Sequence, residues 1–524
     1  MKTIISILLL ITLISCSSRA TNFTVKDGIL IESITIISTD ETGTIEKYLG
    51  YILIDQSEIV FCGKEEPNVK GKLKIINGKG KYAIPGLIDS HVHLNNIAGI
   101  NFRQRKANEE LVNDYFDRLP RNFLYFGYTS LIDVDNYAPN TIERLRDIRI
   151  RPEIYTCAQK VQVMDDFEMV MNESPQNERY ETPFLYDNYN ENIKIPDSIN
   201  LGLHTPSSLI SQITQKDNIC VKTLYEDAAS GLPQVWEVPT LEIMNELVTE
   251  AHAKDLPVIM HATSYEGQLF AVNAGVDVIA HAMWNWTSNP EDYLNTNLPE
   301  THKELLLDIS NKRIGYQPTF RVILAEKDIL DNTFKDSPIL KLLYTPRYID
   351  WLQSEDAQWS RDKILARPKF LEKMNPEFFN PIRSQFNSDE EMIDKLYKSY
   401  ELKIQKVVSL LAENNANLLF STDNGAMNMY THPPGYNGYL EMQHWFDAGV
   451  PLKQIFKAAT YNNAKEFDLI NSVGTLSIGK TANILILNSN PFETIEAYND
   501  IQFVLMNGEL IEREKLTSKY DGTN

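Results

Sequence analysis

The stretch AIPGLIDSHVHL, residues 83–94, decides how the rest of the chain is interpreted. It opens with a Pro-Gly turn signal and continues into a short apolar run, which indicates a buried strand. Side chains two residues apart share one face of a strand, so His91 and His93 are expected to project together from its carboxyl end. Two neutral imidazoles placed in this way can bind one divalent metal. Two ordinary polar residues at a strand end are the alternative for an isolated His-x-His.

Four further apolar runs end in a residue suited to the same kind of site. Residues 219–221 precede Lys222, 258–260 precede His261, 276–280 precede His281, and 418–422 precede Asp423. A parallel barrel of alternating strands and helices gathers the carboxyl ends of its strands on one face, where active sites are built. The other histidines do not follow such runs and are interpreted as surface or loop residues: His204, His252, His302, His432 and His444.

The order of the predicted elements favours an α/β fold, a (β/α)8 TIM-like barrel. Strands are expected near residues 86–92, 128–134, 151–157, 218–224, 256–261, 276–281, 314–319 and 416–422. Apolar residues at helical spacing in 241–254 and 397–415 predict helices before the fifth and the eighth strand. Two insertions, about 160–215 and 321–400, interrupt this order. The second contains Trp351 and Trp359, and we expect it to be an ordered lid over the active face.

Several motifs along the chain resemble those of the amidohydrolase superfamily, in particular its imidazolonepropionase-like and Xaa-Pro dipeptidase-like branch. They are residues 83–94, GYTSLID at 127–133, 256–284 with His261 and His281, LFSTDNGA at 419–426, and 474–495 followed by VLMNG at 504–508. The resemblance implies that the two β-rich ends of the chain join as a small β-sandwich beside the barrel. The expected division is a signal peptide at 1–15, β-sandwich segments at 16–84 and 471–524, and a barrel at 85–470.

The resemblance also implies a centre with two divalent metal ions. His91, His93 and Asp423 would bind the first ion, and His261 and His281 the second. A carbamate formed on Lys222 by carbon dioxide would bridge them. Imidazole and carboxylate ligands suit zinc, with manganese, iron or cobalt as alternatives. Without that carbamate the site would hold one metal, and His261 or His281 would polarise the substrate.

The expected function is hydrolysis of an amide or cyclic amide C–N bond in a small molecule or dipeptide. A metal-bound hydroxide would attack the carbonyl carbon, with Asp423 as general base and then general acid. Tyr225, three residues after Lys222, is either a substrate-binding residue or a packed tyrosine at the barrel mouth. A deaminase or another hydrolase on the same metal site is one alternative function. A surface binding lipoprotein with a degenerate barrel is another.

Charge and the N-terminus bear on partners and location. The 524-residue chain has a formal net charge of -21, which argues against nucleic acid or an acidic membrane surface as a partner. The apolar run of residues 4–14 is too short to span a bilayer and ends in LISC, which resembles a bacterial lipobox. Cleavage before Cys16 and its lipidation would anchor the exported protein in the cell envelope, and a plain secretory signal cleaved near Ala20 is the alternative.

Three cysteines remain after Cys16, which is an odd number. They are Cys62, Cys157 and Cys220, each in an apolar, strand-like context. Buried free thiols are expected for all three, with no disulfide framework.

Overall fold

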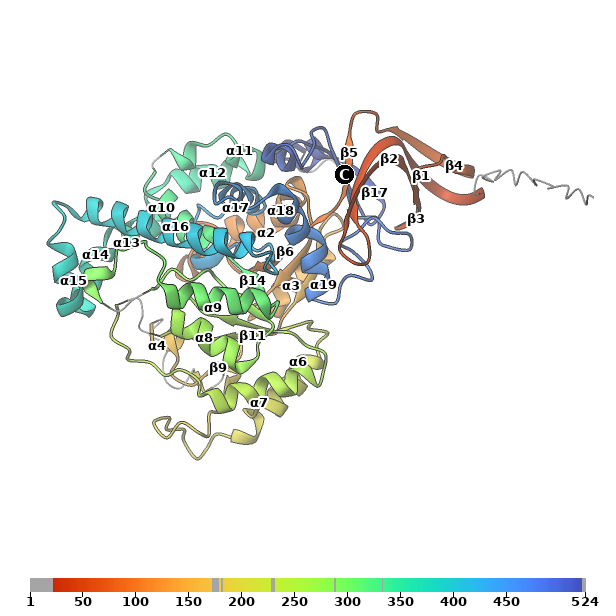
Figure 1. Ribbon diagram of the computed structural model, residues 1–524. Helices are drawn as coiled ribbons and strands as arrows, with labels where there is room; N and C mark the ends of the chain where they lie inside the picture. Colours follow the sequence, from red (N-terminus) through yellow and green to blue (C-terminus); the bar gives the residue numbers. More distant parts are fainter. Residues whose placement is uncertain are drawn as a thin grey trace, which may run out of the picture.

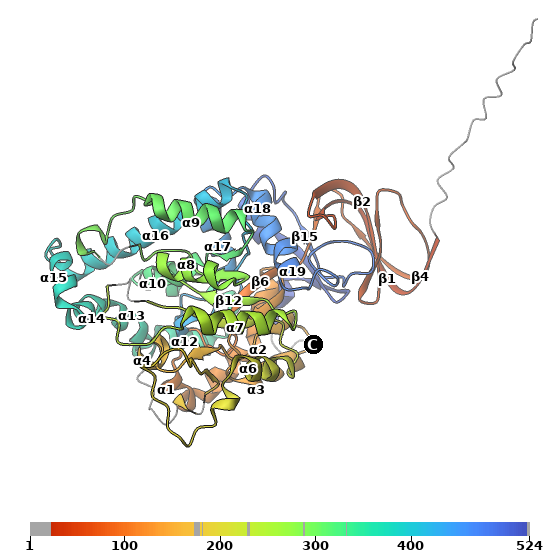
Figure 2. The same cartoon turned by 60° about the horizontal axis from the view of Figure 1, so that its bottom comes forward.

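The computed structural model describes residues 22–171, 179–180, 182–227, 231–286, 289–331 and 333–520. Figure 1 shows a β-rich part on the right of the view, built from both ends of the chain, beside a larger body in which helices surround short strands. Figure 2, turned by 60°, shows the same two parts side by side.

One sheet joins the two ends of the chain. Its strand order is β17-β16-β15-β5-β1-β2-β3, with β4 paired to β1. The bounds are β1 Asn22–Thr39, β2 Ile45–Asp55, β3 Glu58–Gly63, β4 Asn68–Asn77, β5 Tyr82–Pro85, β15 Ile484–Leu487, β16 Ile501–Met506 and β17 Glu509–Glu512. β15 pairs antiparallel with β5, which connects the C-terminal strands to the N-terminal ones. Buried isoleucines dominate the core of this sheet, in keeping with the preference of β-branched side chains for strands.

Seven of the eight strands predicted for the larger body are present near their predicted positions. A three-stranded parallel sheet contains β6 Leu87–Val92, β7 Tyr128–Asp133 and β8 Glu153–Thr156. A four-stranded parallel sheet contains β11 Val221–Leu224, β12 Val258–His261, β13 Val278–Ala280 and β14 Gly315–Gln317. The two sheets approach one another through isolated bridges between Cys157 and Cys220 and between Val161 and Thr223.

The eighth predicted strand is not a regular strand. Residues 418–424 pair with both neighbours only through isolated bridges, Leu418 with Tyr316 on β14 and Asn424 with Val92 on β6. A side chain replaces part of the ladder here, because Asn463 Nδ2 donates to the carbonyl oxygens of Ile88 and Phe420, both at 2.8 Å. The segment therefore lies between β14 and β6. It keeps part of the backbone ladder, because the Ser90 N–H donates to the carbonyl oxygen of Phe420 at 3.1 Å and the Leu419 N–H to that of Tyr316 at 2.9 Å.

Helices follow most of these strands. The long ones are α2 Glu109–Tyr125, α3 Pro139–Asp147, α6 Pro206–Thr214, α7 Leu241–His252, α8 Tyr265–Ala274, α9 Glu300–Asn311, α16 Asp389–Glu413 and α17 Tyr436–Asp447. The two helices predicted at 241–254 and 397–415 correspond to α7 and α16. α16 begins eight residues earlier than predicted because Ser388 caps it, its side chain accepting from the backbone N–H of Glu391.

The second insertion is helical and reaches two loops of the larger body. It contains α10 Phe320–Asp328, α11 Leu340–Leu343, α12 Pro346–Gln353, α13 Trp359–Leu365, α14 Arg367–Met374 and α15 Pro376–Arg383. The indole N–H groups of Trp351 and Trp359 both donate to the carbonyl oxygen of Gly99, at 3.3 and 3.2 Å. Asn375 Nδ2 donates to the carbonyl oxygen of Gly231 at 2.8 Å. The insertion thus contacts the loops that follow β6 and β11.

The prediction of free thiols is wrong for two of the three cysteines. Cys157 and Cys220 form a disulfide with a Cα–Cα distance of 4.6 Å. They are direct partners across the bridge between the third and fourth predicted strands, and this distance suits a disulfide. The sequence does not reveal this pair, because three cysteines leave one thiol unpaired and their spacing does not show which one. Cys62 is free and half-buried.

Membrane contact was predicted only through the N-terminus. Within the described ranges no helix combines the length and apolar character needed to cross a bilayer. The predicted signal peptide and Cys16 lie outside the described residues.

Candidate metal centre

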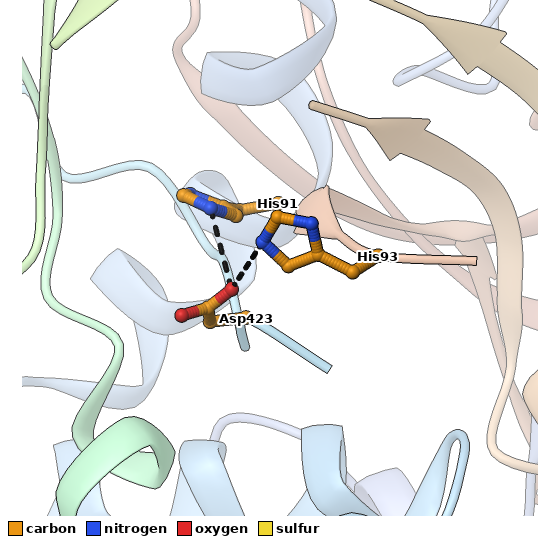
Figure 3. Close-up of side chains that lie close together, drawn as sticks. All are labelled: His91, His93 and Asp423. Carbon is orange, nitrogen blue, oxygen red and sulfur yellow. Dashed lines mark ion pairs between the residues drawn. The ribbon is translucent and has the colours of Figure 1, made fainter. Parts of the chain in front are cut away.

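Three of the predicted ligands converge at the end of β6. His91 lies on β6 and His93 one residue beyond it, while Asp423 belongs to the segment between β14 and β6. Asp423 Oδ1 is 2.8 Å from His93 Nε2 and 3.4 Å from His91 Nε2 (Figure 3). Among the described residues these three form the group whose ligand atoms all lie within 4.8 Å of one another. His91 and Asp423 are only 1% and 6% exposed.

The backbone turns sharply at Asp423 and Gly425, which brings the Asp423 side chain to the two histidines. Asp423 has a φ of 53°, in the left-handed region, and its N–H donates to the carbonyl oxygen of His91 at 2.8 Å. Gly425 has a φ of 92°, and a Cβ at this position would lie 2.6 Å from the carbonyl oxygen of His93. A glycine is therefore needed for the loop after Asp423 to pass so close to the histidine pair.

A residue that sequence reasoning missed fixes the orientation of His91. Gln317, the last residue of β14, donates through Nε2 to the carbonyl oxygen and the hydroxyl of Ser90, at 3.1 and 2.9 Å. Its amide oxygen consequently faces His91 Nδ1 at 2.9 Å and accepts the ring N–H. This leaves His91 Nε2, the nitrogen beside Asp423, with a free lone pair for a metal. A glutamine at a strand end is too common a feature to predict this role.

The other two predicted histidines lie next to the first group. The ring centroid of His281 is 5.3 Å from that of His91 and 4.4 Å from that of His261. His281 Nδ1 is 2.8 Å from the hydroxyl oxygen of Thr319, and when Nδ1 is the donor of this hydrogen bond its Nε2 has a lone pair for a cation. The four predicted histidines therefore form a continuous row across the ends of β6, β12 and β13.

Lys222 lies close enough to this row to influence the charge of its members. It is 5% exposed, and within the described part of the chain its Nζ has no hydrogen-bond partner. Burial lowers the pKa of Lys222 to about 8. Its charge also contributes to the lowered pKa values of His91 and His281. A buried amine without a partner is rare, and a carbamate bridging two cations would give this nitrogen a function.

The electrostatics suit cation ligands. Burial first, and then the charge of Lys222, holds the pKa of His91 well below its ordinary range. Burial and His261 have the same effect on His281. Burial alone would raise the pKa of Asp423, but the neighbouring His91 and His93 outweigh it and keep that pKa well below its usual value. The pKa of His93 is raised. Burial lowers it, but the negative charge and the hydrogen bond of Asp423 outweigh burial.

This donor set fits a divalent metal. Asp423 Oδ1 is fully buried and has no hydrogen-bond partner of acceptable geometry in the described structure, although two imidazole nitrogens face it. Two imidazoles and a carboxylate that converge in this way are ligands that a cation would satisfy. His91, His93 and Asp423 are the residues that would hold the first ion, and His261 and His281 are adjacent candidates for a second.

The predicted site residue Tyr225 packs against a helix beside this cluster. The ring of Tyr225 stacks on Phe270 of α8 with centroids 4.4 Å apart, and its N–H donates to the carbonyl oxygen of His261. This is the packed environment given as its alternative, and a substrate-binding role for Tyr225 stays a prediction. Cys16 lies outside the described residues.

The structure also corrects the interpretation of other residues. His302 is buried on α9, so the surface or loop prediction is wrong for it. His432 lies in a loop, as predicted, but is buried, and its Nε2 is 3.1 Å from the carbonyl oxygen of Arg321. Glu226, which sequence reasoning did not single out, is 8% exposed and lies 3.0 Å from His261 Nε2. A carboxylate four residues after Lys222 was the only available signal for it.

Comparisons with known proteins match the chain in part by sequence and more widely by fold. The model of the amidohydrolase family matches residues 389–511, which include Asp423. A 5-methylthioadenosine/S-adenosylhomocysteine deaminase from Clostridium tetani (strain Massachusetts / E88) is 46% identical over 68 residues, 13% of this chain and 15% of the relative. The match thus spans about one seventh of that protein's length.

Solved structures match over nearly the whole chain and show the fold. A Xaa-Pro dipeptidase with methionine bound in its active site shares it with a TM-score of 0.58 and 16% identity, over 93% of this chain and 100% of the other. A putative prolidase from Bifidobacterium longum has a TM-score of 0.57 and 17% identity, over 93% and 95%. The match to the amidohydrolase family model covers residues 389–511, and the fold is shared with these dipeptidase structures over nearly the whole chain.

Proposed function

We propose that the protein is a metal-dependent hydrolase that cleaves an amide or cyclic amide C–N bond in a small molecule or dipeptide. The observation that carries this proposal is the gathering of four histidines and Asp423 at the ends of parallel strands, with the buried Lys222 of β11 beside them. The family match and the fold shared with dipeptidases support the same chemistry.

In this proposal His91, His93 and Asp423 would hold one divalent ion, His261 and His281 would hold a second, and Lys222, as a carbamate, would supply an anionic ligand between them. Zinc is the metal that this mixture of imidazole and carboxylate ligands suits best. Bound metals would polarise the substrate carbonyl and make water acidic enough to ionise near neutral pH. The chain's own residues then have to orient the substrate and move one proton.

Asp423 is the residue placed to move that proton. Its Oδ1 faces the histidines, while its other carboxylate oxygen points away from both rings (Figure 3). That second oxygen can accept a proton from the attacking water and return it to the nitrogen of the leaving group. The return step matters because an amide nitrogen leaves poorly unless it is protonated.

The architecture that supports the site is proposed to be a closed eight-stranded barrel at residues 85–470. Isolated bridges at Cys157–Cys220, Tyr316–Leu418 and Val92–Asn424 lie between the two parallel sheets and the eighth segment, and they support this proposal. The sheet formed by the two ends of the chain would be a separate β-sandwich domain, with segments 16–84 and 471–524.

The test is a screen of metal-loaded protein against dipeptides and cyclic amides, with release of a new amino or carboxyl group as the readout. Hydrolysis that disappears with a chelator and returns with zinc supports the proposal. The local 46% identity to a deaminase favours deamination on the same metal site as the second candidate. Ammonia release from adenine-containing nucleosides, without peptide hydrolysis, would assign the protein to that class.

The helical insertion is proposed to act as a lid. Trp351 and Trp359 connect it to the carbonyl oxygen of Gly99, in the loop that follows the His91–His93 strand. We expect a product analogue to change the tryptophan fluorescence of the wild-type protein, and Trp359→Phe to reduce this change.

Trimming residues of the insertion is expected to raise KM while both metals stay bound. Loss of metal together with activity on trimming would instead make the insertion part of the core.

Envelope anchoring through Cys16 stays a prediction. The short apolar run that ends in LISC predicts a mature chain that begins at Cys16 and partitions with membranes. Cys16→Ser is expected to block processing or to release the protein, as read by N-terminal sequencing and membrane fractionation. A wild-type protein that is soluble, with an N-terminus near Thr21, would contradict the lipoprotein assignment.

A further inference from the structure

The side chain of Glu226 meets the outermost histidine of the row. It lies in the loop after β11, and its Oε2 is 3.0 Å from His261 Nε2. The same oxygen accepts a hydrogen bond from the hydroxyl of Thr263 at 3.0 Å. We propose that Glu226 is the positioning residue of the second metal subsite, holding His261 so that Nδ1 presents its lone pair to the ion. This inference rests on the proposed two-metal site.

The direction of the hydrogen bonds determines which nitrogen of His261 carries the proton. Asn285 Nδ2 can only donate, and it donates to the Thr263 hydroxyl oxygen at 3.0 Å. The Thr263 hydroxyl therefore donates its own proton to Glu226. As a carboxylate, Glu226 can only accept, so His261 Nε2 must be the donor. In a neutral imidazole the other nitrogen, Nδ1, then has no proton and is free to bind a metal.

The carboxylate is itself held in place. Glu226 is 8% exposed, and the indole N–H of Trp236 donates to its carbonyl oxygen at 2.6 Å. Backbone and side chain are thus both fixed before any metal binds. Two other histidines of the row also have one ring nitrogen at hydrogen-bond distance from a neutral polar side chain. Gln317 accepts from His91 Nδ1, and the Thr319 hydroxyl is 2.8 Å from His281 Nδ1. Glu226 has the corresponding place beside His261.

Direct metal binding by Glu226 is the competing role. Within the described residues, only His91, His93 and Asp423 bring three ligand atoms within 4.8 Å of one another. Glu226, His261 and His281 do not converge in this way. Glu226 lies at hydrogen-bond distance from Nε2 of the His261 ring, and a carboxylate bonded to one ring nitrogen can orient a histidine that binds a metal through the other.

The experiment measures binding of cobalt(II) to the metal-free full chain, by calorimetry and by the visible absorption of the bound ion. Wild type is expected to bind two ions. Glu226→Ala is expected to weaken the second ion about 10- to 100-fold, the range for removal of such a partner, and to leave the first ion unchanged. Asp227→Asn is the matched control, because Asp227 is the next carboxylate and accepts from Ser264 instead of His261. It is expected to bind both ions as wild type does.

Two conservative variants separate positioning from charge, and decide the matter if Glu226→Ala does not fold. Glu226→Gln keeps an acceptor oxygen at the same reach and is expected to retain both ions. Glu226→Asp keeps the charge but shortens the reach by one methylene and is expected to lose the second. The opposite pattern would overturn the proposal in favour of a purely electrostatic role or a direct ligand.

Failure of this inference and failure of the proposed function give different results. If wild type binds no cobalt at all, the metal-dependent function fails. If wild type binds two ions and Glu226→Ala and Glu226→Asp bind them equally well, the function stands and the role of Glu226 is rejected.

Discussion

Replacing Asp423 with asparagine is expected to lower turnover by at least about 100-fold, the usual contribution of a general acid–base group. Asparagine has nearly the same shape, so it fits the buried position between His91 and His93. Its amide group, however, carries no charge for the first ion and cannot accept the proton of the attacking water. The readout is steady-state hydrolysis of a substrate found in the screen, together with metal content.

Asp447→Asn is the control for this substitution. Asp447 ends α17 and is exposed, so its change is expected to leave turnover unaltered. Turnover of Asp423→Asn close to that of wild type, on a confirmed substrate, would remove Asp423 from the reaction.

Opening the Cys157–Cys220 disulfide is expected to lower the free energy of unfolding by about 4 kcal/mol, the chain-entropy value for a loop of this length. The two cysteines are 63 residues apart in sequence, so the bond restricts a large loop in the unfolded chain. The measurement is urea unfolding of the wild-type protein with and without a reductant. Cys62→Ala, which keeps the disulfide, should show the same difference between the two conditions.

A difference below about 1 kcal/mol between oxidised and reduced protein would contradict this account, because it is less than the usual range for a native disulfide. Metal content measured on both samples shows whether the bond also supports the site. Cys220 lies two residues before Lys222, so a loosened β8–β11 contact is expected to reduce occupancy of the bridged centre.

Strand positions and the histidine cluster could be predicted from sequence because they follow local rules. Alternation along β6 places His91 and His93 on one face, and parallel strands bring their carboxyl ends together. This reasoning identified His261, His281 and Lys222 without any knowledge of their distances. The regular strand expected at 416–422 was wrong, because Asn463 competes for its carbonyl partners from a distant helix.

The residues that orient the ligands could not be predicted in the same way. Gln317 and Glu226 act through hydrogen bonds whose direction depends on Ser90, Thr263 and Asn285, and no sequence spacing encodes that geometry. The disulfide was missed for a related reason. Cys157 and Cys220 become neighbours only because the first insertion returns the chain to the adjacent strand position.

Metal content is the measurement that tests the account most directly. Protein expressed with ample zinc, purified without chelator and examined by elemental analysis should carry close to two divalent ions per chain. A value near one would keep the His91, His93 and Asp423 site and reject the carbamate bridge on Lys222. No bound metal in folded protein would contradict the central claim that this row of histidines is a catalytic metal centre.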